Sequence, residues 1–557
     1  MNGEVHGFLR AEGRKLENEA GQEVLLRGVG FGSWMLPEGY MWRFPGAGDR
    51  PRRIERMIAE LVGAEKAASF WGLYYERYIA EADIARIAAE GFNSVRLPLH
   101  WRVLMEEGEP AAFKADGWRV LDQVIAWCRE YGLYVVLDLH GAPGGQTGTN
   151  IDDSERDLPE LFTDERYRRL TIALWRELAK RYKDEWIVAG YDLLNEPLPD
   201  WFAKYNSLVM PLYRDIIAAI REHDTRHMII LEGAHWATDW SIFSGDKPDG
   251  NLMLQFHKYW NSPDTESIRR FLDKREEWDV PIYMGEGGEN NKEWYAGAFR
   301  LYEDHDISWN FWTWKKMDTD NSPCSIRKPE GWELLVRFLE GGEKPDPASA
   351  ERVLWSYLDN LPFEACNFHA DVVNALFRRP EVRIPAIFYG YKSEGDGFGG
   401  SGRKSGQGGD GVDSGNGAGD KRAGLPIGFR DGDGTDIRFL VPRDGAMPNF
   451  QHGGGEPWTD EDWLYVRLER GEWLGYDFEV EKAGRIAAEL RLSTPDGIAR
   501  LVVRVDDKPF DLSVPATSDW RTVEGGDAVS LAPGPHRIQV FAGEGSVNLL
   551  WVRLRRV

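Results

Sequence analysis

Short apolar runs alternate with helix-like stretches from about residue 23 to residue 314. The eight runs are "VLLRGVGF", "NSVRLPL", "LYVVLDLH", "GYDLLNEP", "HMIILEG", "LMLQFHKY", "PIYMGEG" and "ISWNFWTW". Several are nearly uniformly apolar and end on polar residues, which is typical of parallel strands covered on both faces. The stretches between them, such as "EADIARIAAEG" and "VLDQVIAWCREYG", place apolar residues three and four apart and stop at glycine. The pattern predicts an α/β fold, a (β/α)8 barrel.

The pattern changes after the barrel. Residues 392–424 are mostly glycine, serine and charged residues, with almost nothing apolar to bury, and predict a flexible linker. Beyond it, period-two runs such as "WLGYDFEV" and "ARLVVRVDD" are separated by glycine, proline and aspartate turns, as in an antiparallel β-sandwich. We therefore expect a barrel domain over 1–391, the linker over 392–424 and an all-β sandwich over 425–557.

Composition narrows the choice of partner and location. The formal net charge of -24 disfavours contact with nucleic acid or an anionic membrane, so a neutral substrate is the simplest partner. No apolar run reaches the roughly 18 residues of a membrane helix, and no apolar leader precedes residue 21, so we expect a cytoplasmic protein unless its N-terminus was trimmed. Cys128, Cys324 and Cys366 form no C-x-x-C pair, which argues against a zinc knuckle or a disulfide framework. The composition carries no indication of oligomeric state.

Polar residues close most of the predicted strands, where a (β/α)8 barrel gathers its functional groups. Glu196 and Glu286, from the fourth and seventh strands, would face each other across the barrel mouth. Such a pair can cut a glycosidic bond if one carboxyl stays protonated and the other is ionised. Arg96 and the Tyr259 hydroxyl would stabilise an anion at Glu286, which favours it as the nucleophile, whereas Asn195 suits a substrate hydroxyl.

Six motifs occur in order along the barrel: "NSVRLPLHW", "DLHGAPGGQ", "LLNEP", "FHKYW", "MGEGG" and "WNFWTWK". With them, the chain from about 23 to 390 resembles the retaining β-glycosidases of glycoside hydrolase family 5. The resemblance implies that Glu196 is the general acid and base and that Glu286 is the nucleophile. It also implies a set of residues lining the subsite of the cleaved sugar, with Trp312 favoured over Trp314 on strand eight. That set is Arg96, His140, Asn195, His257, Tyr259 and Trp312 or Trp314.

The loops after strands one and three point toward exo action. Glu38 in "WMLPEGYMW" and the stretch "DLHGAPGGQTGTN" resemble the exo-acting β-1,3-glucanases of the family, in which a glutamate after strand one holds the terminal sugar. Asn150 stands about where those enzymes use an aspartate. We expect exo or β-glucosidase-like cleavage of β-linked glucans or gluco-oligosaccharides. An endo-β-glucanase or mannanase, a transglycosylase and, from another class, a non-catalytic sugar-binding protein are the alternatives.

The predicted sandwich resembles family 6 carbohydrate-binding modules through "GEWLGYDFEVEKAG", "SDWRTVEG", "LAPGPHRIQV" and "VNLLWV". The resemblance implies that Trp520 and Asn548 contact sugar. Leu468 stands where such modules usually carry the tyrosine that supplies an opposing ring. Sugar binding and a purely structural role therefore remain alternatives for this region.

Asp138 and His140 form a D-x-H pair, to which His257 could add a third metal ligand. Two residues along a strand are about 7 Å apart, and a metal site would leave the paired glutamates unexplained. We therefore expect neither a metal nor a cofactor. Glu196 and Glu286 could instead form structural salt bridges at the strand ends. That alternative does not explain why six motifs occur in order.

Overall fold

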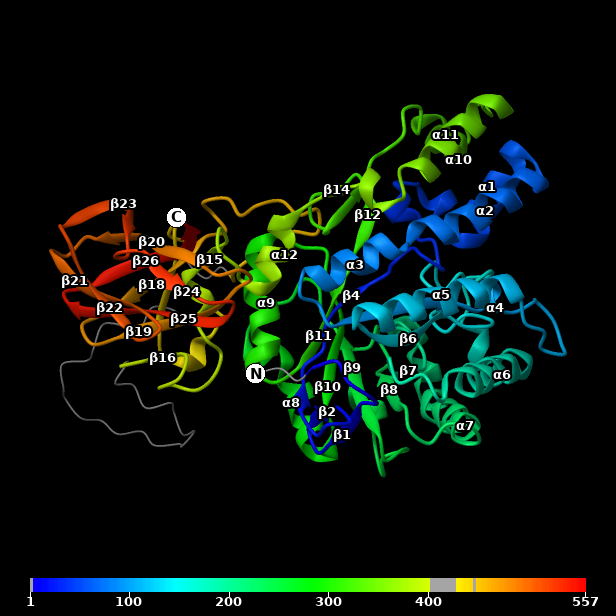
Figure 1. Ribbon diagram of the computed structural model, residues 1–557, viewed down its shortest axis with the longest axis horizontal. Coiled ribbons are helices and arrows are strands. Elements are labelled where there is room, and N and C mark those ends of the chain that lie inside the picture. The colour runs from blue at the N-terminus through cyan, green and yellow to red at the C-terminus, as the bar shows by residue number, and fades with distance from the viewer. Residues whose placement is uncertain (1–3, 401–426, 444–446) are drawn as a thin grey trace. The chain divides into compact units, whose positions relative to one another are not determined.

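The computed structural model describes residues 4–400, 427–443 and 447–557. The chain forms two compact units, coloured along the sequence in Figure 1. The first comprises Met1–Tyr259, Arg270–Gly288 and Asp306–His369, and the second comprises Trp260–Arg269, Glu289–His305 and Ala370–Val557. Along the described parts of the chain, no helix combines the length and apolar character needed to cross a bilayer.

The first unit contains a closed barrel of eight parallel strands, in the order β10-β11-β4-β5-β6-β7-β8-β9. Each strand lies within or next to one of the eight apolar runs, so the predicted (β/α)8 barrel is confirmed. The strands are β4 (Arg27–Gly30), β5 (Ser94–His100), β6 (Tyr134–Gly141), β7 (Val188–Asp192), β8 (Met228–Glu232), β9 (Leu252–His257), β10 (Ile282–Gly288) and β11 (Ser308–Trp312).

Every residue of β5 and β6 is buried, as expected of strands covered on both faces. Val95, Leu97 and Leu99 alternate along β5 with Arg96, whose guanidinium is fully buried. Successive side chains on a strand point to opposite faces, so Arg96 points the other way from these three apolar side chains. The barrel thus encloses the positive charge of the Arg96 side chain.

Helices follow the strands in chain order, and Figure 1 shows α3, α5, α6 and α7 outside β4 to β8. The Asp164 carboxylate accepts the Arg166 amide to begin α6, and Gly132 ends α5 in the left-handed conformation, with φ 69°. The α-helices are α1 (Pro51–Val62), α2 (Ala64–Tyr78), α3 (Glu81–Ala89), α4 (Trp101–Leu104), α5 (Ala115–Tyr131), α6 (Glu165–Tyr182), α7 (Val209–Arg221), α8 (Thr265–Trp278), α9 (Lys292–Asp304), α10 (Glu333–Leu339), α11 (Pro347–Asp359) and α12 (Ala370–Phe377).

Two small sheets accompany the barrel in the first unit. One is antiparallel, with the order β1-β2-β3, and the other has the order β12-β13-β14. Their strands are β1 (Arg10–Glu12), β2 (Lys15–Glu17), β3 (Glu23–Val24), β12 (Lys315–Met317), β13 (Cys324–Ile326) and β14 (Asn367–Phe368).

The second unit contains two antiparallel sheets, so the predicted sandwich-like region is confirmed. One sheet has the order β17-β18-β26-β20-β23, with β15 against β26 and β24 against β20, and the other has the order β16-β19-β25-β21-β22. The strands are β15 (Arg383–Pro385), β16 (Phe398–Gly399), β17 (Asp436–Phe439), β18 (Leu464–Leu468), β19 (Trp473–Val480), β20 (Gly484–Thr494), β21 (Ala499–Val505), β22 (Lys508–Val514), β23 (Thr517–Glu524), β24 (Val529–Leu531), β25 (Gly534–Glu544) and β26 (Val547–Arg556).

Strand pairing differs from the expected domain boundary at residue 391. β15 pairs with β26, and β16 pairs with β19, so residues on both sides of that boundary join the sandwich sheets. These strands are three and two residues long, too short to show an alternation of apolar and polar residues in the sequence. Their pairing with the long strands β26 and β19 holds them in the sheets. Of the linker expected over 392–424, residues 401–424 lie outside the described residues.

Candidate active site

The strand ends of the barrel bring eight of the expected residues into one connected network. The residues are Arg96, His140, Asn195, Glu196, His257, Tyr259, Glu286 and Trp312. All belong to the first unit and come from β5, β6, β9, β10 and β11 and from the segments that follow β7 and β9. Asn195 and Glu196 lie three and four residues beyond the end of β7 at Asp192, rather than on the strand itself.

Arg96 is the hub of this network. Its guanidinium donates to the Glu286 carboxylate, to Asn195 Oδ1 at 2.9 Å and to Asp192 Oδ2 at 2.9 Å. It also donates to Glu232 Oε1 at 2.9 Å. Arginine cannot be deprotonated at ordinary pH, so it provides a fixed positive charge that balances several buried carboxylates.

Glu286 is buried and held on both oxygens. Arg96 Nη1 donates to Oε1, and the Tyr259 hydroxyl donates to Oε2 at 2.7 Å. Burial raises the pKa of Glu286 above 4.5, while the positive charges of His257 and Arg96 oppose this shift. Hydrogen bonds from a cation and a hydroxyl favour the ionised form of this carboxyl and so act against the effect of burial.

Glu196 is positioned through its backbone as well as its side chain. Its amide donates to Glu232 Oε2 at 2.7 Å, and its Oε1 accepts from His257 Nδ1 at 2.8 Å. Its φ of 45° lies in the left-handed region, which is unfavourable for a residue with a side chain. The structure around Glu196 therefore imposes its orientation.

The two histidines carry shifted pKa values. Burial disfavours the charged form of His257, but the carboxylates of Glu232 and Glu286 outweigh it and hold its pKa well above 6.5. Burial likewise opposes charge on His140, yet Asp138, which accepts from His140 Nδ1 at 2.8 Å, helps raise that pKa to about 9. Both shifts favour the charged form of the ring, which adds positive charge beside the paired glutamates.

Trp312 and Trp314 lie in different surroundings. Trp312 stacks on His140, with ring centroids 5.3 Å apart and an interplanar angle of 8°, and its indole donates to the Tyr40 hydroxyl. Trp314 is fully buried, and its indole donates to Asp83 Oδ1 at 2.8 Å. The structure thus brings Trp312 to the site and places Trp314 elsewhere.

Glu38 and Asn150 lie in loops around the network. Glu38 is buried at the start of a short 3-10 helix, Gly39–Trp42, and its negative charge also contributes to the raised pKa of His140. Asn150 lies in the loop after β6, where its carbonyl accepts the Asp153 amide. Within the described ranges, no hydrogen bond joins the Asn150 side chain to the site.

Sequence reasoning missed three buried polar residues of the network. Asp192 and Glu232 both accept from Arg96, and Gln255 Nε2 donates to Asp192 and to Glu232. Asp192 ends β7 and Glu232 ends β8, so the strand-end rule that found Glu196 and Glu286 applies to them as well. Gln255 stands two residues before His257, on the same side of β9.

Asn548 and Trp520, the accessory residues expected in the second unit, lie on β26 and β23. The Asn548 amide donates to Ser493 Oγ at 3.2 Å. Trp520 meets Tyr465, with ring centroids 5.3 Å apart and an interplanar angle of 66°. A tyrosine therefore accompanies Trp520 after all, three residues before Leu468, because strand alternation puts Leu468 on the buried side and Tyr465 on the exposed side.

Two overlapping groups of side chains are close enough to ligate one metal ion. They are Asp138, His140 and Glu286, and Glu196, His257 and Glu286, with ligand atoms within 4.8 Å of one another in each group. Both groups contain Glu286, which accepts from the Arg96 guanidinium and the Tyr259 hydroxyl. A metal ion would have to share this carboxylate with a permanent cation, so the donor set suits two catalytic carboxyls better than a metal.

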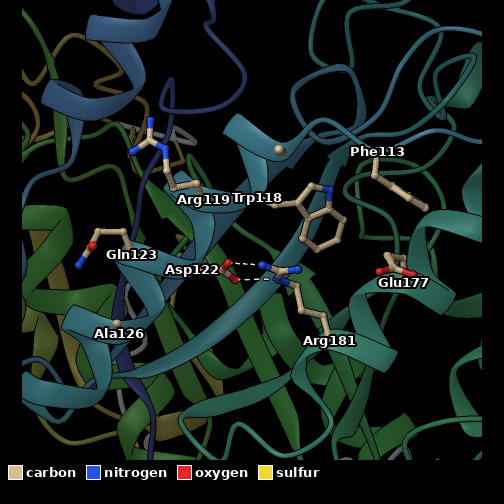
Figure 2. A pocket seen from close by; sticks show the side chains of 9 residues that line it. Phe113, Trp118, Arg119, Asp122, Gln123, Ala126, Glu177 and Arg181 are labelled. Atoms are coloured by element: carbon tan, nitrogen blue, oxygen red, sulfur yellow. Dashed lines mark hydrogen bonds and ion pairs between the residues drawn. The ribbon is translucent and has the colours of Figure 1, made fainter.

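A surface pocket of about 590 Å³ is lined by Phe113 and by residues of α5 and α6. Figure 2 shows Arg181 donating to Asp122 across it, beside Trp118 and Phe113. Arginine, carboxylate and aromatic side chains line it, and none of them belongs to the network around Arg96. Its chemistry is that of a solvated helix–helix groove.

The chain is similar in sequence to several known glycosidases. A family model described as Cellulase (glycosyl hydrolase family 5) matches residues 59–318. A β-xylosidase of Phanerodontia chrysosporium is 30% identical over 343 residues, which are 55% of this chain and 71% of the relative. An endoglucanase C of Acetivibrio thermocellus is 26% identical over 323 residues, which are 47% of this chain and 91% of the relative.

A probable glucan 1,3-β-glucosidase A of Emericella nidulans is 31% identical over 239 residues, 42% of this chain. The match spans 57% of that relative's length. Among solved structures, the endoglucanase Cel5A of Thermotoga maritima aligns with a TM-score of 0.39 and 20% identity, over 54% of this chain and 91% of that one. An endogalactoceramidase aligns with a TM-score of 0.46 and 15% identity, over 98% of this chain and 100% of that one.

Proposed function

Because the chain belongs to glycoside hydrolase family 5, we propose that it is a retaining β-glycosidase in which Glu286 is the nucleophile and Glu196 the general acid and base. The observation that carries this proposal is the proximity of the two carboxyls. One oxygen of Glu196 and one of Glu286 lie within 4.8 Å of each other, and His257 Nδ1 lies 2.8 Å from Glu196 Oε1 and 3.6 Å from Glu286 Oε2. Retaining enzymes separate these groups by about 5–5.5 Å, whereas inverting enzymes leave about 6.5–9.5 Å for a water molecule.

In the first step, a Glu286 oxygen attacks the anomeric carbon, and the bond from that carbon to the leaving oxygen breaks. Protonated Glu196 gives its proton to the leaving oxygen, so the leaving group departs as a neutral alcohol. The Tyr259 hydroxyl and Arg96 hold the attacking carboxylate in place through its two oxygens. The product of this step is a glycosyl ester on Glu286.

In the second step, Glu196 is a carboxylate and removes a proton from a water molecule. The water oxygen attacks the anomeric carbon and releases Glu286 as a carboxylate. Esterification of Glu286 removes a negative charge beside Glu196, which favours the ionised form of Glu196 that this step requires. His257, hydrogen-bonded to Glu196 Oε1 at 2.8 Å, keeps that oxygen oriented in both steps.

The proposed substrate is a β-linked gluco-oligosaccharide or short glucan, cut from one end. Glu38 is buried two residues before Tyr40, whose hydroxyl accepts from the Trp312 indole, so the loop after β4 supports a closed end for the subsite of the cleaved sugar. Relatives named as a β-xylosidase and a glucan 1,3-β-glucosidase favour exo action, while the relative named as an endoglucanase keeps endo cleavage as the alternative. A transglycosylase would use the same two glutamates and protect the ester from water.

A hydrolysis screen tests the proposal. Aryl and disaccharide β-glucosides, β-xylosides, β-galactosides and β-mannosides are offered, and the anomeric configuration of the first product is followed by NMR. Retention with release of single sugars supports an exo-acting retaining enzyme. An α-configured first product contradicts the double displacement, and release of internal fragments from a polymer selects the endo alternative.

We also propose that the sandwich binds sugar at Trp520. The edge-to-face contact of Trp520 with Tyr465 provides two ring faces on one sheet, and Asn548 lies on β26, the strand beside β18 of Tyr465. Binding of an inactive Glu286→Ala protein to insoluble β-glucan, with and without Trp520→Ala, measures this. Equal binding with and without Trp520→Ala would leave the sandwich a structural role.

A further inference from the structure

Gln146 is a fully buried residue of the loop after β6, and the mechanism described above does not use it. Its side-chain amide makes three hydrogen bonds. Nε2 donates to the His140 carbonyl at 2.7 Å and to the Asn195 carbonyl at 2.9 Å, and Oε1 accepts the Ala142 amide at 3.0 Å. Both N–H groups of the side chain are therefore used. They connect the end of β6 with the segment that carries Glu196.

Gln146 reaches these groups because the chain reverses just before it. The Gly145 amide donates to the Ala142 carbonyl at 3.0 Å, which closes a four-residue turn of sequence "APGG". Gly144 and Gly145 both have φ 77°, a left-handed conformation that glycine adopts without strain. Proline second and glycine third is the order typical of a type II turn. A β-carbon at Gly145 would clash with Ser154 Oγ, so the turn has no room for a larger residue there.

The peptide group between Asn195 and Glu196 is held at both ends. Gln146 Nε2 donates to its carbonyl, and its N–H, which belongs to Glu196, donates to Glu232 Oε2 at 2.7 Å. The orientation of this peptide group sets φ of Glu196, which is 45° and is unfavourable for a residue with a side chain. Such a conformation persists where the surrounding structure imposes it, and these two hydrogen bonds do so.

The main chain of Gln146 holds the other side of Glu196. The Leu198 amide, two residues beyond Glu196, donates to the Gln146 carbonyl at 3.1 Å. One residue therefore binds the chain both before and after the proposed acid and base. His257 contacts the Glu196 carboxyl itself, so the imidazole orients the side chain while Gln146 orients the backbone that carries it.

We propose that Gln146 is a positioning residue for proton transfer, which fixes the backbone of Glu196 so that its carboxyl meets first the leaving oxygen and then the attacking water. The inference rests on the proposed function, since Gln146 acts only through Glu196. A misplacement of about 1 Å can cost about 10²-fold in rate. Loss of Gln146 should therefore affect the steps in which a proton moves through Glu196, and only those steps.

Gln146→Met tests this role, because methionine has a similar size and no donor for the two carbonyls. Two substrates with the same cleaved sugar are compared, a β-linked disaccharide and the 2,4-dinitrophenyl β-glycoside. The disaccharide needs a proton on its leaving oxygen, so its kcat/KM should fall by about 10- to 100-fold. Dinitrophenolate leaves without a proton, so kcat/KM for the aryl glycoside should stay within about twofold of the parent protein.

The second step gives an independent signature. Breakdown of the glycosyl ester needs Glu196 as a base with either substrate, so Gln146→Met should lower kcat for the aryl glycoside. The ester then accumulates, and KM should fall together with kcat. A protein that is only less well folded would lose kcat and kcat/KM equally and would keep its KM.

Gln146→Glu is the second variant, and it should separate the two substrates in the same way. It keeps the size of the side chain and the acceptor for the Ala142 amide, but its ionised form has no donor. Its protonated form can donate to one of the two carbonyls. The disaccharide rate of Gln146→Glu should therefore rise relative to that of Gln146→Met as the pH falls.

Trp175→Phe is the matched control. The buried Trp175 indole on α6 donates to the Leu193 carbonyl at 3.1 Å, so this variant also removes a side-chain donor to the segment that leads to Glu196. Both Trp175→Phe and Gln146→Met should lower the midpoint of urea unfolding. Only Gln146→Met should separate the two substrates.

Equal losses of kcat/KM on both substrates in Gln146→Met would show that Gln146 only supports the fold. Parent rates on both would show that Glu196 does not depend on it, and the same separation in Trp175→Phe would assign the effect to general weakening of the segment. Each of these results overturns the inference. If Glu196→Ala itself leaves the disaccharide rate unchanged, the proposed function fails instead.

Discussion

His257 Nδ1 lies 2.8 Å from Glu196 Oε1. The same atom lies 3.6 Å from Glu286 Oε2, so one imidazole is in contact with both proposed catalytic carboxyls. Since Glu232 on its other side helps hold His257 in the charged form, the ring can donate to Glu196 when that residue is ionised. This arrangement suits Glu196, which in the proposed mechanism loses a proton in the first step and regains one in the second.

Glu196→Ala should separate substrates by their leaving groups. General acid catalysis contributes about 10²–10⁴-fold, so cleavage of a disaccharide should fall by that order. An aryl glycoside with a strongly acidic phenol needs little proton transfer and should still form the glycosyl ester. Azide should then accelerate turnover and give a β-glycosyl azide. Equal losses on both substrates would contradict the role of Glu196.

Glu232→Gln tests a residue that positions Glu196 without reaching the substrate in our scheme. Removing this carboxylate takes away the largest effect that raises the pKa of His257, so that pKa should fall. NMR titration of the His257 ring measures the shift, and kcat should fall with it. A lower kcat with an unchanged His257 pKa would show that Glu232 acts through packing alone.

The acidic limb of the pH profile should report Glu286. The nucleophile must be ionised, and burial raises the pKa of Glu286 above 4.5. Activity is therefore lost as the pH falls through this raised pKa, and the limb of kcat/KM should lie above 4.5 rather than below it. Tyr259→Phe removes a hydrogen bond to the ionised form and should move the limb further upward. A limb that stays in place would exclude Glu286 as its source.

Lys315 supports the barrel through a buried ion pair. Its ammonium lies 2.6 Å from Asp83 Oδ1 and donates to the carbonyls of Tyr78 and Leu361 at 2.9 Å. Lys315→Ala leaves Asp83 buried without this charge, and breaking such a pair costs about 3–5 kcal/mol. Urea unfolding should show a loss of that size, with Lys66→Ala, at an exposed pair, close to the parent protein. A loss below about 1 kcal/mol would contradict this account.

The barrel and the pair of glutamates at its strand ends could be predicted from the sequence, because the spacing of apolar residues and their position along the chain are enough to identify them. Strands buried on both faces leave long apolar runs, and parallel strands in a closed barrel bring their ends together, which gave Glu196 and Glu286 as a pair. Trp314 shares a face with Trp312 only if the strand continues, and β11 ends at Trp312. Strand periodicity stops there, so only the folded structure shows that the Trp314 indole reaches Asp83.

Other features depend on contacts that the sequence pattern does not encode. Asp192 and Glu232 stand at strand ends, where the sequence rule could have found them, but their pairing with the same buried arginine is a contact between strands that the pattern does not encode. The short strands β15 and β16 owe their conformation to partners more than 70 residues away in the chain. The contact between Trp201 and Trp236 likewise depends on two loops that are joined by the hydrogen bond from the His235 amide to the Leu198 carbonyl.

The most direct test of the account is to trap the covalent intermediate. A 2-deoxy-2-fluoro-β-glycoside with an activated leaving group slows hydrolysis of the ester more than its formation, so the glycosyl enzyme accumulates. Mass spectrometry of the digested protein should find the fluorosugar on the peptide that contains Glu286, and Glu286→Ala should abolish the label. A label on any other residue, or full turnover of this glycoside by Glu286→Ala, would contradict the assignment of Glu286 as the nucleophile.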